Sequence, residues 1–314
     1  MREPDGICRI LVSYWYYRKR DLAALAGQTK LPVQLFADSG AFTAFTMRGS
    51  GAVIRREEYA AWLKHWWPLL SVAVNLDVIG DSAGSARNQL WLEGQGLPVL
   101  PVYHMQTPLA ELHALCRDYR YVAVGGTANL KGANKLAATA RAMLIAREHG
   151  TRIHGLGRSA SAELAALPFW SVDSSSWSQA SRFGGLAVFE DGKVRSLRVQ
   201  DAVGRPQLLR AHGADPQLMR DAAYANTGRK WGRVKTQQAY DRERHESLRV
   251  AAVAWKRMEA YLQQRHAVPA PPGLEGDGTT MWFVDAVPER LHQMMRAVEW
   301  LADRPGASTR KGER

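Results

Sequence analysis

The chain has 314 residues, of which 46% are hydrophobic, so it can bury a core of ordinary size as one large αβ domain or as one domain with an appendage. Its longest apolar stretches have only the length of strands and its first residues lack a signal peptide's apolar region, so we expect a cytoplasmic protein without membrane contact. With only two cysteines, Cys8 and Cys116, a disulfide framework and a Cys-rich zinc site are excluded, and a formal net charge of +12 favours a phosphate polyanion as partner.

Eight apolar, β-like segments recur along the first two thirds of the chain, mostly alternating with helical patterns at 57–70, 109–118 and 130–149. This alternation predicts an α/β fold, namely a TIM-type (βα)8 barrel over residues 1–198. An open doubly wound sheet is the structural alternative. The expected strands lie near Ile10–Tyr14, Gln34–Asp38, Val72–Asp77, Val99–Tyr103, Tyr121–Val124, Arg152–His154, Trp170–Asp173 and Leu186–Phe189.

Residues 199–314 are strongly basic and predict a mainly helical extension. A long helix over 236–264 has an apolar stripe, so it fits a solvated basic helix packed on the barrel through Val250, Trp255 and Leu262. It also fits a nucleic-acid face, because the glycines, cations and tryptophan of 226–235 suit a phosphate backbone and a stacked base. We expect a loop over 268–279, a last helix over 288–301 and disorder from about 304. The expected nucleic-acid contacts are Arg229, Lys230, Trp231, Arg233 and Lys235.

Polar residues stand at the carboxyl ends of the expected strands, which a barrel would bring to one rim. Asp38 and Asp173 each end an apolar run and precede a serine, so two acids could face one substrate. Each feature alone is ordinary, since an aspartate after a strand is often a helix N-cap. Together, three carboxylates, two imidazoles, glycines and an aromatic suit a flat polar heterocycle. The other members of this set are Phe42, Asp77, His104, Gly125, Gly126 and His154.

The order of these motifs resembles the tRNA-guanine transglycosylase superfamily, and more closely its DNA-modifying DpdA branch from bacteriophages and bacterial genomic islands. The motifs run from about Tyr14 to Gly184 as DSGAF, NLDVIGD, PVYH, VAVGG, HGLG and SVDSSSW. The resemblance implies a (βα)8 barrel that exchanges guanine in a polynucleotide for a 7-deazaguanine base, such as 7-cyano-7-deazaguanine, without breaking the chain. It implies DNA and the free base as partners, no cofactor, and the host cytoplasm for a phage-encoded protein; a homo-oligomer is left open.

The resemblance also implies a role for each matching residue. Asp173 resembles the nucleophile, and Asp38 resembles the general acid and base. Asp77 resembles the carboxylate that reads the N1 and 2-amino edge of guanine, and Phe42 the aromatic that stacks on the base. The other implied substrate contacts are Ser39 in the DSG turn, His104 in place of a glutamine, Gly125 and Gly126 as a glycine pair with exposed backbone groups, and His154 in place of an apolar residue on the base's other face.

Two departures from the tRNA enzymes bear on the substrate. Those enzymes carry a C-x-C-x2-C…H zinc site after the nucleophile, whereas no cysteine follows Asp173 here, so no metal site is expected. They usually read DSGG where this chain reads DSGA. Both departures favour the DNA branch. A tRNA-directed enzyme and a non-catalytic nucleic-acid-binding barrel, or an unrelated barrel hydrolase, are the alternatives.

The exchange reaction has requirements that this residue set could meet. Displacing guanine from C1′ develops positive charge on the sugar and negative charge on the base, so a retaining route needs one carboxylate to bond to the sugar and another acid to protonate the base. Asp173 and Asp38 fit these two roles. Water must be excluded, because hydrolysis would leave an abasic site, and the target nucleotide must leave the base stack.

Overall fold

A computed structural model describes residues 4–47, 49, 51–126, 130, 132–220, 237–266 and 279–304, without the side chains of 237–243. The expected nucleic-acid contacts Arg229, Lys230, Trp231, Arg233 and Lys235 lie outside the described residues. In the described part, no helix is long and apolar enough to cross a membrane.

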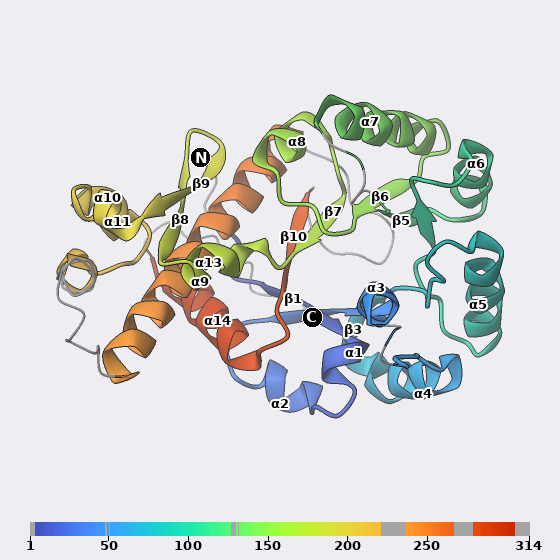
Figure 1. The fold of residues 1–314 in the computed structure, drawn as a ribbon, viewed down its shortest axis with the longest axis horizontal. Coiled ribbons are helices and arrows are strands. Elements are labelled where there is room, and N and C mark those ends of the chain that lie inside the picture. The colour runs from blue at the N-terminus through green and yellow to red at the C-terminus, as the bar shows by residue number, and fades with distance from the viewer. Residues whose placement is uncertain are drawn as a thin grey trace.

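Eight parallel strands form one curled sheet in the order β3-β2-β1-β10-β7-β6-β5-β4 (Figure 1). The two edge strands approach each other beyond β3, where Val74 forms a parallel bridge with Leu100. There the Asn75 N–H donates to the Leu100 carbonyl at 2.9 Å, and the Leu100 N–H donates to the Ala73 carbonyl at 2.7 Å. The strands are β1 Cys8–Ser13, β2 Val33–Asp38, β3 Leu70–Ala73, β4 Val102–His104, β5 Tyr121–Gly125, β6 Arg152–Gly155, β7 Ser171–Ser174 and β10 Thr280–Val284.

The eighth strand of this sheet is not the predicted one. Leu186–Phe189 lies in β8 (Gly185–Glu190), which pairs antiparallel with β9 (Lys193–Arg198) in a separate two-stranded sheet. Asp191 and Gly192 between them have φ of 50° and 73°. An Asp-Gly pair with positive φ at both positions is a two-residue hairpin turn, so this local signal was present in the sequence.

The place expected for β8 is taken by β10, between β1 and β7. Ile10 pairs with Phe283, and Asp173 pairs with Trp282. The expected division after residue 198 therefore cuts through the unit that holds the sheet. Short apolar runs such as those in β8 and β10 have the same periodicity, and only long-range pairing decides which one joins the main sheet.

Helices cover the outside of the curled sheet, and the predicted helices at 57–70, 109–118, 130–149, 236–264 and 288–301 correspond to α4, α6, α7, α13 and α14. Two of the described helices, α2 and α5, begin at an aspartate that accepts an N–H group of the first turn: Asp21 accepts from Ala24 and Asp81 accepts from Gly84. The helices are α1 Tyr14–Tyr17, α2 Leu22–Ala26, α3 Ala41–Thr46, α4 Arg56–Trp66, α5 Ser82–Gly94, α6 Leu109–Asp118, α7 Gly132–Glu148, α8 Ser161–Ala166, α9 Gln179–Arg182, α10 Val199–Val203, α11 Pro206–Ala211, α13 Gln237–His266 and α14 Pro288–Ala302, with 3-10 turns η2 Trp67–Leu69 and η3 Ser176–Ser178.

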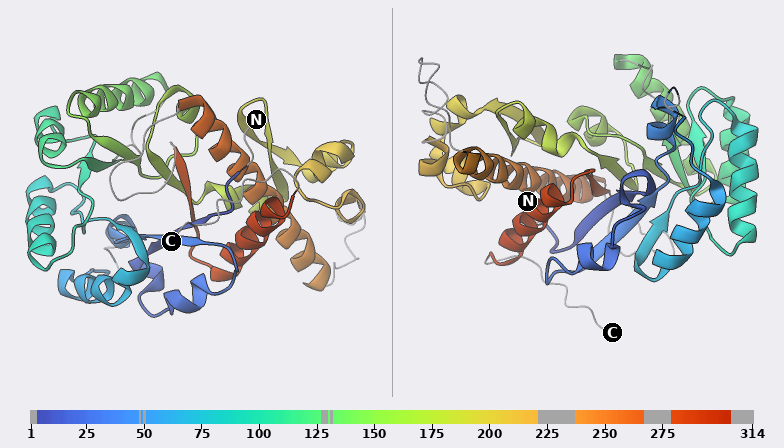
Figure 2. Two further views of the ribbon diagram at one scale, coloured as in Figure 1. Left: turned by 180° about the vertical axis from the view of Figure 1, so that it is seen from behind. Right: turned by 60° about the horizontal axis from the view of Figure 1, so that its bottom comes forward.

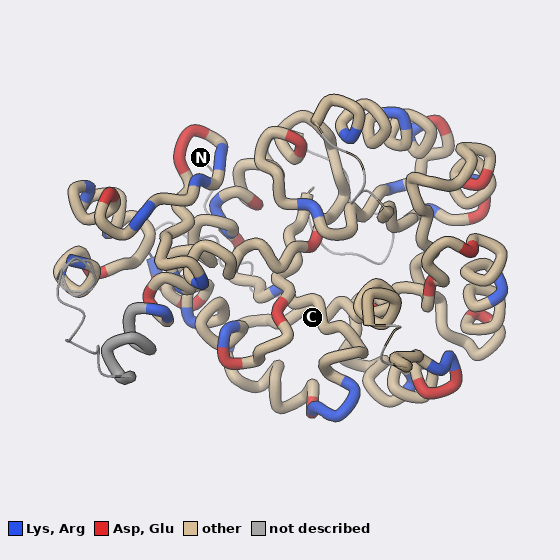
Figure 3. Tube along the Cα trace, in the orientation of Figure 1, with Lys and Arg blue, Asp and Glu red and all other residues tan. Residues whose placement is uncertain are grey.

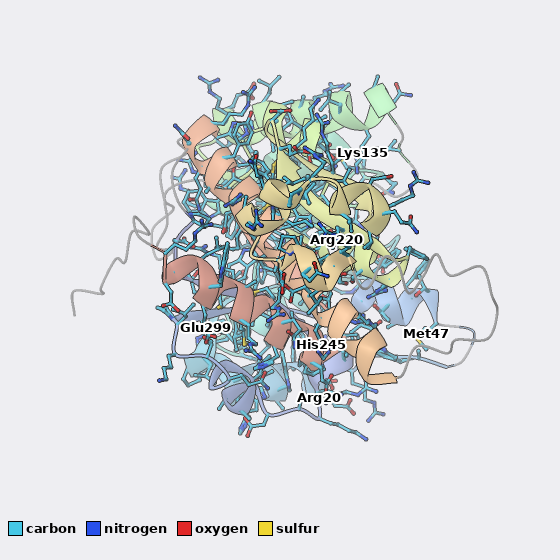
Figure 4. The ribbon with its side chains drawn as sticks, turned by 90° about the vertical axis from the view of Figure 1, so that its left-hand side faces the viewer. Arg20, Met47, Lys135, Arg220, His245 and Glu299 are labelled. Carbon is cyan, nitrogen blue, oxygen red and sulfur yellow. The ribbon has the colours of Figure 1, made fainter. Side chains whose placement is uncertain are left out.

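The long helix α13 is a packing element as well as a basic one. Val250, Trp255 and Leu262 are buried as expected, but Lys256 and Glu259 on the same helix are buried too, so this stretch is not the solvated basic helix of that interpretation. Beyond α13, the hairpin β8–β9 and helices α10 and α11 form a lobe away from the curled sheet (Figures 1 and 2). Figure 4 shows this side of the molecule, with His245 on α13 and Glu299 on α14. Lys and Arg are spread over several outer elements (Figure 3).

Alternation along the strands separates two apolar layers. One cluster fills the inside of the curled sheet, and a larger one lies between the sheet and its helices. In β2, Phe36 belongs to the inner cluster whereas Leu35 and Ala37 belong to the outer one. Because side chains alternate with a period of two, Asp38 has the same inward direction as Phe36. The inner cluster comprises Leu11, Phe36, Val74, Leu100, Val102, Ala123 and Trp282.

A group of charges, buried except for the half-buried Asp5, lies where β1 and β10 begin, and we call Asp5, Arg9, Lys256 and Glu259 the amino-end cluster. The Arg9 guanidinium donates to Asp5 at 2.7 Å and to Glu259 at 3.0 Å. Lys256 donates to Asp5 at 2.8 Å and also contacts Glu259. Glu259 in addition accepts the backbone N–H of Met281 at 2.9 Å. The cluster thereby joins the N-terminal segment, β1, α13 and β10.

Candidate active site

The carboxyl ends of the parallel strands bring polar residues to one end of the curled sheet. Asp38 and His104 are the last residues of β2 and β4, and Asp173 is the third residue of β7. His154 lies in β6, and Asp77 follows β3 after a short segment. In α/β folds with parallel strands, this end of the sheet is where substrates bind.

Asp38 begins a turn that only glycine can complete. The Gly40 N–H donates to Asp38 Oδ2 at 2.9 Å, and Gly40 has φ of 78°, which disfavours any residue with a side chain. A Cβ atom at Gly40 would lie 2.6 Å from the Trp15 Cβ and 2.7 Å from the Ser13 Oγ. Glycine at position 40 is therefore required by geometry, and α3 starts directly after it.

The three carboxylates are close enough to affect one another. Burial raises the pKa of Asp38, the negative charges of Asp77 and Asp173 raise it further, and it reaches about 7. The Gly40 N–H and the Ser13 hydroxyl oppose this increase only in part. A carboxyl group with a pKa near neutrality can both donate and accept a proton under physiological conditions, which is what a general acid and base requires.

Asp77 and His104 form a pair. His104 Nε2 lies 2.9 Å from Asp77 Oδ2, and 11% of the Asp77 side chain and 14% of the His104 side chain are exposed. His104 was expected to contact the base itself, but its Nε2 is occupied by Asp77. Asp77 therefore has a fixed orientation at the rim, with its other oxygen, Oδ1, without a hydrogen bond to the described residues.

Asp173 is held through one of its two oxygens. Its Oδ1 accepts the Gly157 N–H at 2.9 Å and lies 3.2 Å from His154 Nε2. His154 is completely buried, and its Nδ1 lies 2.6 Å from Ser171 Oγ. His154 was expected on the second face of the base; in this structure the ring is fully buried and both of its nitrogens have partners inside the sheet.

The remaining expected contacts differ in accessibility. Phe42, in the first turn of α3, is 60% exposed, so its ring is available for stacking. Ser39 is fully buried and its Oγ accepts the Ala41 N–H at 3.2 Å, so its expected contact with the substrate is not supported. Gly125 ends β5 and is buried, and the carbonyl of Gly126 accepts a hydrogen bond from the Gln106 side-chain amide.

Sequence reasoning missed Asp285, which follows β10 at the same end of the sheet. This carboxylate is buried, accepts from Ser178 Oγ at 2.9 Å and from Arg290 at 3.1 Å, and its own carbonyl accepts from the Tyr17 hydroxyl. The segment MWFVD has the same form as the runs before Asp38 and Asp173, namely apolar residues that end in aspartate. It was missed because its strand was taken for part of a loop and helix region.

Comparison with known proteins adds no assignment. No protein-family model matches this chain, and no curated protein matches it either. Among the described residues, no group of three or more histidine, cysteine, aspartate or glutamate side chains is arranged to hold a metal ion. Any function must therefore be argued from the carboxylates and their neighbours.

Proposed function

We propose that the protein is a DNA-guanine transglycosylase, which exchanges guanine in DNA for a free 7-deazaguanine base through a covalent glycosyl-aspartate. The observation that carries this proposal is the placement of Asp38, Asp77 and Asp173 at one end of the sheet, close enough that the charges of the other two, together with burial, raise the pKa of Asp38. Two roles, an attacking carboxylate and a carboxylic acid that is protonated near neutrality, are what base displacement at a sugar carbon requires.

The first half of the reaction removes guanine. A carboxylate oxygen of Asp173 forms a bond to C1′ while the bond from C1′ to N9 breaks, and its electron pair goes to the guanine. Protonated Asp38 gives its proton to the leaving base and becomes a carboxylate. The product is neutral guanine together with an ester between Asp173 and the DNA sugar, so charge and protons balance.

The second half inserts the new base by the reverse path. The Asp38 carboxylate takes the proton from N9–H of the incoming 7-deazaguanine, and N9 bonds to C1′. The bond between C1′ and Asp173 breaks, and its electron pair returns to the Asp173 carboxylate. Asp38 ends protonated, as it began, so one residue serves as acid and then as base.

Base recognition is assigned to Asp77 and Phe42. The free oxygen of Asp77 would accept from the N1–H and 2-amino groups of guanine, while His104 holds the carboxylate in place. A 7-deazaguanine presents the same donors at this edge, so one site can accept both bases in turn. The exposed ring of Phe42 would stack on the base and offset part of the cost of removing the nucleotide from the helix.

The choice of DNA and of the complete fold is part of the proposal. A TIM-type (βα)8 barrel is supported by the strand order and by the bridge from Val74 to Leu100. DNA is favoured over tRNA by the absence of any cysteine after Asp173, and nucleic acid by the net charge of +12. The basic segment 226–235 is proposed to contact phosphates.

The test is to incubate the protein with 7-cyano-7-deazaguanine and either DNA or tRNA, digest the nucleic acid and identify its nucleosides by mass spectrometry. We expect the corresponding deoxynucleoside in DNA with the wild-type protein and none with Asp173→Ala. Product in tRNA alone would replace the proposed substrate with tRNA. Product in neither nucleic acid would refute the proposed function.

A further inference from the structure

Polar side chains from three neighbouring strands, β5, β6 and β7, form a series of hydrogen bonds inside the curled sheet that ends at Asp173. The Tyr121 hydroxyl lies 2.5 Å from Ser171 Oγ, and Ser171 Oγ lies 2.6 Å from His154 Nδ1. His154 Nε2 then lies 3.2 Å from Asp173 Oδ1. We call Tyr121, Ser171 and His154 the hydrogen-bond chain. Ser171 and Asp173 share a face of β7 because they are two residues apart.

With a neutral His154 ring, only one direction of hydrogen bonding gives each contact of the hydrogen-bond chain one donor and one acceptor. A carboxylate only accepts, so the proton between His154 and Asp173 must sit on His154 Nε2. In a neutral imidazole the other nitrogen, Nδ1, then accepts from the Ser171 hydroxyl. Burial raises the pKa of Tyr121, so its phenol keeps a proton to donate to Ser171 Oγ.

Packing holds the His154 ring in this arrangement. His154 is completely buried, with its ring centroid 4.6 Å from that of Phe36 and 6.4 Å from that of Tyr121. A buried ring with both nitrogens occupied has little freedom to rotate, since a flip would break two hydrogen bonds without water to replace them. The orientation of the Nε2–H toward Asp173 is therefore fixed before any substrate arrives.

We propose that the hydrogen-bond chain positions the nucleophile by fixing Asp173 Oδ1, so that Oδ2 is the oxygen that bonds to C1′. Oδ1 accepts from both Gly157 and His154, whereas the described residues leave Oδ2 without a hydrogen bond. This inference rests on the proposed function, because it presupposes that Asp173 attacks the sugar. When the bond from Oδ2 to C1′ forms, the bond from C1′ to N9 breaks and guanine leaves with the proton of Asp38.

The Gly157 N–H and the His154 Nε2–H can donate to Asp173 Oδ1 both before the reaction and in the ester. Oδ1 becomes the carbonyl oxygen of the ester and continues to accept from Gly157 and His154, so neither hydrogen bond has to break. Tyr121, Ser171 and His154 neither bond to the substrate nor exchange a proton with it, and they are positioning residues. Misplacement of a reacting oxygen by about 1 Å can slow a reaction about 100-fold, which sets the scale of the expected effects.

The hydrogen-bond arrangement is tested first without any substrate. In protein labelled with nitrogen-15 at histidine, and with His154→Gln to assign the signals, His154 should show a protonated Nε2 and an unprotonated Nδ1. Ser171→Ala removes the donor to Nδ1 and should change the Nδ1 signal. A proton on Nδ1 of wild-type His154, or an unchanged spectrum in Ser171→Ala, would overturn the arrangement.

The effect on the reaction is tested with two substitutions at one position. Glutamine at 154 can place an amide N–H near the former Nε2, whereas leucine fills the space without a donor. We expect His154→Leu to lower kcat for base exchange about 100-fold with KM for the free base unchanged, and His154→Gln to stay within about 10-fold of wild type. Equal losses in the two variants would refute positioning through a hydrogen bond.

Tyr121→Phe and Tyr17→Phe form a matched pair, since each removes one hydrogen-bonded tyrosine hydroxyl. The Tyr17 hydroxyl donates to the Asp285 carbonyl at 2.8 Å and lies outside the hydrogen-bond chain. We expect Tyr121→Phe to lower kcat and Tyr17→Phe to leave it unchanged; equal effects would contradict the inference. A wild-type protein with no exchange on DNA or tRNA would instead refute the proposed function, while the nitrogen-15 spectrum would still decide the hydrogen-bond arrangement.

Discussion

Two groups of charged residues lie at opposite ends of the curled sheet, and they shift the pKa of a carboxyl group in opposite directions. In the amino-end cluster, burial alone would raise the pKa of Asp5, but Lys256 and Arg9 outweigh it and lower that pKa. At the carboxyl end, burial and the like charges of Asp77 and Asp173 both raise the pKa of Asp38. No lysine or arginine pairs with these three carboxylates in the part of the chain that the structure describes; the pairs of Asp77 and Asp173 are with histidine.

The difference separates charges that hold the fold from charges that are free to react. Opposite charges at the amino end lower the pKa of Asp5 and connect four segments of the chain, which suits a structural role. Like charges at the carboxyl end leave Asp38 able to gain or lose a proton near neutral pH, at a cost in stability. The two ends should therefore respond differently to substitution and to pH.

Replacement of the nucleophile should give the largest effect on activity and almost none on folding. Asp173→Ala removes the group that bonds to C1′, so base exchange should fall by more than about 1,000-fold. Its thermal unfolding temperature should stay close to that of the wild type. Exchange of labelled guanine into DNA measures the first quantity, and retention of more than a few per cent of wild-type activity would reject the role of Asp173.

Replacement of a carboxylate in the amino-end cluster should lower stability and leave kcat unchanged. Glu259→Gln leaves Arg9 and Lys256 buried with less compensation, so the free energy of unfolding should fall by about 3–5 kcal/mol. The folded fraction should keep its kcat. Urea unfolding provides the measurement, and Asp5→Asn, at a more exposed position of the same cluster, is the control with a smaller loss. A drop in kcat without a loss of stability would contradict the division between the two ends.

Asp77→Asn should weaken base recognition while leaving the fold intact. The substitution exchanges an acceptor for a donor opposite guanine's own donors, so kcat/KM for guanine exchange should fall by about 2–4 kcal/mol when expressed as a free energy. Asp77→Glu, which keeps the acceptors at a different reach, is the comparison. An unchanged kcat/KM in Asp77→Asn would place the recognition carboxylate elsewhere.

The smallest expected effect is a difference in pH dependence between the two ends. The folded-state pKa of Asp38, about 7, lies above the ordinary value of 3.8, so its contribution to stability is complete below about pH 3.8 and is lost as the pH rises to 7. Asp38→Asn cannot ionise, so its stability advantage over wild type should grow over that range and then level off.

Asp5 should show the opposite sign. Its pKa is lowered in the folded state, so its contribution is present above the ordinary value of 3.8 and is lost as the pH falls below it. Unfolding curves of the wild type, Asp38→Asn and Asp5→Asn between pH 3 and 8.5 test both signs. A pH-independent difference between Asp38→Asn and wild type would contradict the raised pKa of Asp38.

Much of the fold was predictable because it depends on local patterns. Seven of the eight strands and the helices α4, α6, α7, α13 and α14 have apolar periodicity that is legible in the sequence. The meeting of Asp38, Asp77 and Asp173 followed from their positions at strand ends. The eighth strand was not predictable in this way, because β10 is chosen by its pairing with β1 and β7, which are distant in sequence.

The sequence predicts which residues form the site better than it predicts the hydrogen bonds that these residues make. Whether His154 faces the base or Asp173 depends on the rotation of a single ring, which the motif HGLG does not specify. Ser39 was expected at the substrate because it follows Asp38, yet the left-handed Gly40 turns the chain so that Ser39 is buried. Strand ends identify which residues meet, whereas the hydrogen bonds among them are decided by packing.

The position of β10 also has a consequence for synthesis of the protein. Asp38, Asp77 and Asp173 are all translated well before Thr280–Val284, which must insert between β1 and β7 to complete the sheet beside Asp173. A ribosome-bound chain that has emerged only as far as the β8–β9 hairpin holds every proposed catalytic residue but lacks the strand that separates β1 from β7. The protein should therefore become competent only after β10 has emerged from the ribosome, and pairing between strands so distant in sequence should make this a slow step of folding.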